Sequence, residues 1–196
     1  MSVREILAVG FLVAGMVGCA SPQEHFYTLM PDSQHPVHGV AEPARAIVVG
    51  AVSVPEAVNR PQLVLELADH QRELLEQERW IEPVAEDLQR AIAQHLSADL
   101  PDTAVSIAGE HWAGPTAYQV LVQVRRFDLV RGSGAHLDAH WVITGKDAVP
   151  LREDNFSTDV AASGRGYEAL VRAQSSAVAA LAEQIARALP DAGIAH

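Results

Sequence analysis

Apolar and polar residues alternate along several stretches of this chain, and alternation is the pattern of half-buried β-strands. The stretches predicted as strands are 46–54, 62–67, 73–80, 103–108, 118–130, 136–143 and 149–160. The second and third are expected to form a hairpin, and the last three, joined by short turns, are expected to form an antiparallel meander. The first stretch is continuously apolar instead, which is typical of a central strand covered on both faces.

Two further segments repeat apolar residues with the 3.6-residue period of an α-helix. The first opens at Pro83 and is stopped by Pro101, and the second runs from Tyr167 to Leu189. Proline suits the first position of a helix, where its missing N–H costs nothing. This order of strands and helices predicts an α+β fold, with a mostly antiparallel sheet and two long helices packed on one face.

The amino terminus combines a weakly basic start with a short apolar run. The run covers residues 6–17, fewer than the roughly 20 that a membrane-spanning helix needs, so an export signal is favoured. It ends in Met16-Val17-Gly18-Cys19, which resembles a bacterial lipobox. That resemblance implies cleavage before Cys19 and attachment of acyl chains, palmitate among them, which together form a lasting anchor. Ala20 then favours the outer membrane. The alternative is an ordinary secretory signal with a chance cysteine.

The expected organisation has four parts: a lipoprotein signal peptide at 1–18, a lipidated N-terminus and tether at 19–45, a folded domain at 46–190 and a tail at 191–196. The tether is rich in proline, which interrupts helices and strands. One piece of it, Phe26-Tyr27-Thr28-Leu29, is aromatic and strand-prone. This piece docks either on its own domain or on a partner.

Composition narrows the possible partners. The formal net charge is −11, so the chain is a poor ligand for nucleic acid or for an anionic lipid surface. Any lipid contact beyond the anchor is therefore expected to be apolar or local. The single cysteine excludes an internal disulfide framework.

No motif predicts catalysis, a cofactor or a resident metal. His136, Asp138 and His140 share one face of a predicted strand, but the two histidines would lie nearly 14 Å apart, too far for one zinc ion. A solvated strand face is favoured for them. No phosphate-binding loop or nucleophile motif is present in the sequence.

Five segments carry a resemblance to a known family, and two of them are the strand through Arg126-Phe127-Asp128 and the helix that starts at Gly166-Tyr167. Val54-Pro55-Glu56-Ala57-Val58-Asn59-Arg60-Pro61-Gln62-Leu63-Val64 resembles a segment of the PqiC family, in which Leu-Pro is followed after three residues by Asp-Arg-Pro-Gln-Leu-Val. Arg79-Trp80-Ile81-Glu82-Pro83 is similar to the family's Trp-x-Glu-Pro before the first helix. Phe26-Tyr27-Thr28-Leu29 matches its aromatic-Tyr-x-Leu piece. Val54 and Asn59 depart from the family pattern.

The resemblance implies an auxiliary lipoprotein of an ABC-type transporter built around an MCE-domain protein. Such a subunit is anchored to the periplasmic face of the outer membrane and has no enzymatic role. Its expected partners are the MCE-domain tunnel protein, the inner-membrane permease and further copies of itself, in a system that moves lipid and maintains membrane integrity. Two alternatives are a lipoprotein chaperone or scaffold for another outer-membrane assembly and, less favoured, a periplasmic hydrolase.

Four residues are candidates for partner binding: Arg60, Trp80, Trp112 and Tyr27. Arg60 presents a planar five-donor fork on a stiff turn. It either locks that turn to Glu82 or a backbone carbonyl, or it contacts a partner. Trp112 lies in a Gly/Pro-containing loop, where it is either an interface anchor or a core residue.

Overall fold

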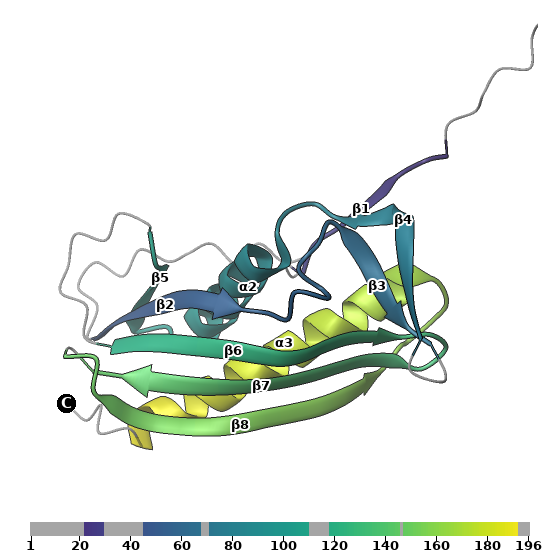
Figure 1. Ribbon diagram of the computed structural model, residues 1–196. Helices are drawn as coiled ribbons and strands as arrows, with labels where there is room; N and C mark the ends of the chain where they lie inside the picture. The colour runs from purple at the N-terminus through teal and green to yellow at the C-terminus, as the bar shows by residue number, and fades with distance from the viewer. Residues whose placement is uncertain (1–21, 30–44, 68–70, 110–117, 146, 192–196) are drawn as a thin grey trace, which may run out of the picture.

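The computed structural model describes residues 22–29, 45–67, 71–109, 118–145 and 147–191, and these form one α+β fold (Figure 1). The α+β class expected from the sequence is confirmed. The strands are β1 (His25–Tyr27), β2 (Arg45–Ser53), β3 (Gln62–Glu66), β4 (Arg72–Trp80), β5 (Thr103–Ile107), β6 (Tyr118–Val130), β7 (Gly134–Thr144) and β8 (Pro150–Ala161). The helices are α2 (Val84–Asp99) and α3 (Tyr167–Asp191).

All eight described strands belong to one sheet. Strand β6 is its centre: one edge pairs with β7 along almost its whole length, while the other edge pairs first with β2 and then, at its far end, with β3. The order across the sheet is β1-β4-β3-β6-β2-β5, with β7 and β8 continuing from β6. The expected β3–β4 hairpin and the β6–β7–β8 meander are both present.

The sheet is mixed, so the expected mostly antiparallel sheet is wrong. Among the described strands, the pairs β1–β4, β2–β5, β2–β6 and β3–β6 are parallel, whereas β3–β4, β6–β7 and β7–β8 are antiparallel. Helix α2 precedes β5 and returns the chain so that β5 runs parallel to β2. Periodicity specifies which face of a strand is buried but not which strand lies beside it.

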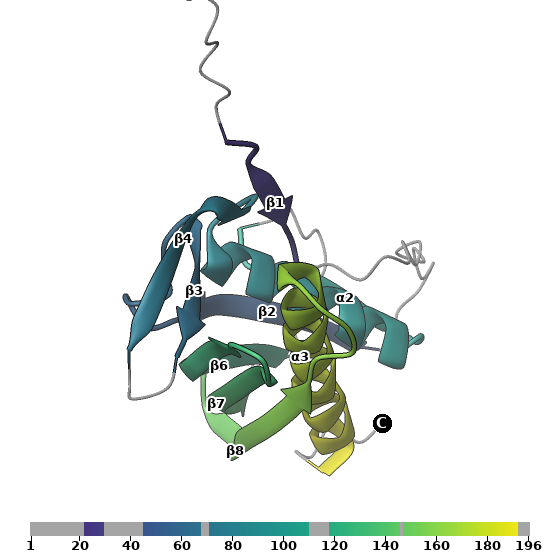
Figure 2. The same ribbon diagram turned by 90° about the vertical axis from the view of Figure 1, so that its right-hand side faces the viewer.

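Both helices cover the same face of the sheet, as expected (Figure 2). Helix α2 packs on β2 and β5, α3 packs on β7 and β8, and the helices contact each other. In β7 the buried residues Leu137, Ala139, Trp141 and Ile143 face α3. On the opposite face of β2, Ala46 and Gly50 are buried but Ala51 is exposed, so the expectation that this strand is covered on both faces holds only in part.

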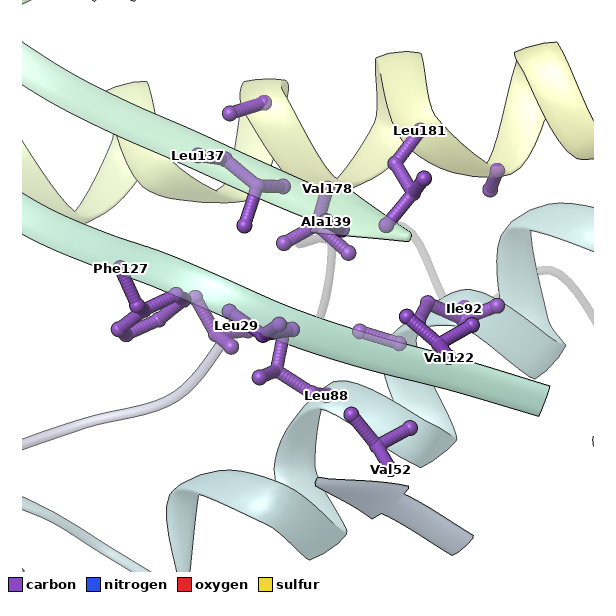
Figure 3. Packing of buried hydrophobic residues seen from close by; sticks show 14 of the residues in the cluster. Leu29, Val52, Leu88, Ile92, Val122, Phe127, Leu137, Ala139, Val178 and Leu181 are labelled. Carbon is purple, nitrogen blue, oxygen red and sulfur yellow. The ribbon is translucent and has the colours of Figure 1, made fainter. Parts of the chain in front are cut away.

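The N-terminal segment docks on its own domain rather than remaining free for a partner. Strand β1 adds to β4 in parallel, and the N–H of Ile81 donates to the carbonyl oxygen of Tyr27 at 2.9 Å. Just after β1, Leu29 is fully buried in the same cluster as Leu88 and Phe127 (Figure 3). The first described strand begins at His25, only six residues after Cys19 in the sequence.

Candidate functional site

The candidate site lies where two strands share one edge of β6. Pairing with β2 extends to Gln123 and pairing with β3 begins at Leu129, so the intervening residues of β6 have no strand beside them on that edge. The loop from β2 to β3 fills this split with the buried side chain of Val58. Trp80 fills it from the end of β4, with its ring centroid 5.9 Å from that of Phe127.

Above this packing is a groove of about 520 Å³, here called the Arg60 groove. Its lining consists of Phe26 and residues 59–61 and 79–83, which come from β1, the loop before β3, the end of β4 and the start of α2. The N–H of Trp80 donates to the carbonyl oxygen of Pro61 at 2.7 Å, which joins the two longer segments. The groove thus unites three of the five sequence segments that carried the family resemblance.

Charge is distributed unevenly around the Arg60 groove. Arg79 pairs with Glu24 at 3.1 Å, and Glu82 pairs with Arg90 of α2. Arg60 is half-buried, and within the described part of the chain its Nε atom is buried without a hydrogen-bond acceptor. The suggested lock between Arg60 and Glu82 is therefore not formed, because Arg90 occupies that carboxylate.

Tyr27 and Trp80 serve the fold at this site. The Tyr27 hydroxyl donates to Glu78, which also contacts His25 at 3.0 Å. Burial and this acidic neighbour raise the pKa of the Tyr27 phenol above its usual range. Trp80 is only 5% exposed, so it forms the floor of the groove rather than a projecting contact.

Asp87 is a site residue that sequence reasoning missed. Its position in the sequence indicates only an acidic residue suited to the first turn of a helix, but its carboxylate is fully buried and accepts from the N–H of Leu29 and the hydroxyl of Thr28. Burial raises the pKa of Asp87, and the two hydrogen bonds oppose that shift. The sequence does indicate this burial, because Asp87 lies in the apolar stripe of the helix, three residues after Val84 and one before Leu88.

Phe26 and Ile81 line the groove but were not among the candidates for binding. Their side chains are 56% and 67% exposed, unusually high for large apolar residues. Both lie in segments that matched the family, and that was the available signal. Trp112 and Cys19 lie outside the described residues.

The histidine-rich face of β7 is built from separate ion pairs. His136 contacts Asp159 at 2.7 Å, Asp138 accepts from Arg125 at 2.8 Å, and Nε2 of His140 lies 3.8 Å from Glu153. Across the residues placed by the structure, no three His, Cys, Asp or Glu side chains are grouped as ligands for one metal ion. Nor does any helix in that part of the chain have the length and apolar character to cross a membrane.

The chain belongs to the family of ABC-type transport auxiliary lipoprotein components, whose pattern it matches over residues 27–186. The PqiC-type resemblance is thereby confirmed, and the protein is an auxiliary component of a transport system by family. The match begins at Tyr27 and includes every segment of the Arg60 groove except Phe26.

Solved structures support the fold. The crystal structure of an uncharacterized protein superposes with a TM-score of 0.71 at 19% identity, covering 86% of this chain and 99% of that chain. The crystal structure of a DUF330 protein from Xanthomonas campestris gives 0.66 at 14% identity, covering 86% of this chain and 96% of that one. No curated protein matches this chain.

Proposed function

We propose that this protein is an outer-membrane lipoprotein, acylated at Cys19, that serves as a non-catalytic adaptor subunit of an MCE-type lipid transport system. The observation that carries the proposal is the family match over residues 27–186, together with a lipobox-like sequence directly before it. The docked β1 strand supports it, because it couples the segment next to Cys19 to the domain.

The two ends of the molecule suit two different contacts. Strand β1 lies at one end of the molecule, whereas the end of β7 and the start of β8 lie at the opposite end (Figure 1). Val149 and Leu151, at that opposite end, are 57% and 42% exposed. Apolar side chains exposed together are typical of an interaction site. In this proposal the β1 end faces the membrane that holds the anchor, and the β7–β8 end contacts the MCE-domain protein.

In-cell photo-crosslinking tests the adaptor role. A photoreactive amino acid is placed at Leu151, at Ile81 or, as a control on the exposed face of α3, at Arg172. The expected result is capture of an MCE-domain protein from Leu151 but not from Arg172. If Leu151 captures no such protein in a chain that is folded and membrane-bound, the adaptor role at this end is wrong. Capture of an outer-membrane assembly protein instead would favour a chaperone or scaffold.

A further inference from the structure

The Arg60 groove combines exposed apolar surface with a half-buried cation whose Nε atom has no acceptor among the described residues. Phe26 of β1 lies opposite Arg79 of β4 in the register, and Ile81 follows two residues later, so all three share one side of the sheet edge. Phe26 and Ile81 are more than half exposed. A groove of 300–1,000 Å³ with mostly apolar walls and a few polar groups is typical of a small-molecule site, and this one measures about 520 Å³.

We propose that the Arg60 groove binds a phospholipid from the membrane leaflet that holds the Cys19 acyl chains. The guanidinium of Arg60 contacts the lipid phosphate, and Phe26 and Ile81 contact an acyl chain. This inference rests on the proposed function, because acylation of Cys19 is what brings the groove to the membrane. It adds a specific phospholipid site to the lipid contact that the acyl anchor itself makes.

Chain length limits how far the groove can be from the bilayer. Strand β1 begins at His25, six residues after Cys19. Six extended residues span at most about 20 Å, and each half of a bilayer with its headgroups is also about 20 Å thick. Phe26 is seven residues after Cys19, so it lies at most about 25 Å from the acylated residue, and β1 is fixed by pairing with β4. This short reach keeps the groove close enough to the bilayer to meet the lipid headgroups.

Local charge favours a phosphate. The chain as a whole carries −11, so general attraction to a membrane is excluded as the source of binding. At the groove, however, Glu82 is neutralised by Arg90 and Arg79 by Glu24, while the Nε atom of Arg60 has no acceptor among the described residues. Nε is itself buried, so a phosphate in the groove would meet the terminal nitrogens of Arg60, and a guanidinium donates two parallel hydrogen bonds to phosphate oxygens.

Photolabelling in vesicles tests the inference with the acylated chain. The native protein is reconstituted into vesicles of phosphatidylethanolamine and phosphatidylglycerol, in which part of the phosphatidylethanolamine carries a diazirine in its acyl chain. After irradiation, labelled peptides are located by mass spectrometry. The expected labels lie on the peptides containing Phe26 and Ile81. Labelling of both should fall about tenfold in Arg60→Gln, the effect of losing one charge-assisted contact.

Matched variants separate a lipid site from a general effect of charge or folding. Ile81→Asp alters a side chain that is 67% exposed and should also remove the labels without unfolding the protein. Arg152→Gln and Leu151→Asp make the same chemical changes on β8 and should leave labelling unchanged.

Two failures have different meanings. A native chain without acyl groups overturns the anchor and this inference together. An acylated, membrane-bound chain whose groove is labelled no more than β8, or is labelled equally in Arg60→Gln, overturns the lipid site alone and leaves the adaptor role standing.

Discussion

The backbone N–H of Leu29 donates to Oδ2 of Asp87 across 2.8 Å, and both residues are fully buried. Oδ1 of the same carboxylate accepts from the Thr28 hydroxyl at 3.1 Å. A residue in the first turn of α2 thus holds the segment that follows β1, although the two lie more than fifty positions apart in the chain. This contact joins the anchor-proximal segment to the domain core.

Replacing Asp87 by Ala should loosen that segment. The Leu29 N–H would lose its acceptor, and an unsatisfied buried donor costs about 1–3 kcal/mol. We expect the free energy of unfolding in urea to fall by roughly 2 kcal/mol and limited proteolysis after Leu29 to become faster. Glu86→Ala removes an exposed carboxylate from the same turn and should change neither measurement. If Asp87→Ala and Glu86→Ala are cleaved after Leu29 at the same rate, Asp87 does not hold the segment.

Asp87 should also give the stability a specific pH dependence. Because burial raises its pKa in the folded state, the native protein binds a proton more readily than the unfolded chain. Its contribution to stability is then fully present below the ordinary carboxyl pKa and is lost as pH rises through the raised value. Asp87→Asn cannot titrate, so the wild type should lose stability relative to this variant over that pH range. A constant difference between the two in urea unfolding would contradict the assignment.

Tyr27 should ionise at a higher pH than an ordinary tyrosine. Its pKa is raised by burial and by the carboxylate of Glu78, since an anionic phenolate is disfavoured beside both. In a spectrophotometric titration, Tyr27→Phe should remove the most alkaline component. Tyr118→Phe provides the matched control and should leave that component in place. Loss of an earlier component in Tyr27→Phe would show that the hydroxyl is not held against Glu78.

Gly134 should not tolerate a side chain. A Cβ at this position would overlap the carbonyl oxygen of Val160, where β7 begins beside the end of β8. We expect Gly134→Ala to lower the free energy of unfolding by roughly 2–3 kcal/mol through forced separation of the strands. Gly132→Ala meets nothing within 4 Å and only has to accept a φ of +74°, so it should cost about 1 kcal/mol. Equal costs at the two positions would refute this difference.

The sequence predicted elements better than it predicted their neighbours. Helical spacing located α2 and α3, and alternation in β7 identified the buried Trp141 and Ile143, because side-chain period directly reflects burial. The parallel pairing of β2 with β5 and β6 was not predicted. Nothing in the apolar run at 46–54 specifies which strands lie beside it. Its two neighbours, β5 and β6, come more than fifty positions later in the chain, after helix α2 has reversed the chain direction.

The candidate site was predicted in part. Arg60 and Trp80 were identified through their segments, and both line the Arg60 groove. Their individual roles depend on neighbours that the sequence does not specify. Glu82, the expected partner of Arg60, pairs with Arg90 instead, and the Trp80 ring packs against Phe127. The contribution of Phe26 and Ile81 required the β1–β4 pairing, which brings together residues more than fifty positions apart.

Mass spectrometry of the native amino terminus tests the central claim, a domain fixed to a membrane by its own lipid anchor. The protein is purified from the membrane fraction, and its N-terminal peptide is sequenced by fragmentation. The account predicts that the chain begins at Cys19, with a diacylglycerol on the thiol and an acyl chain on the amino group. A native chain with an unmodified Cys19, recovered in the soluble fraction, would contradict it.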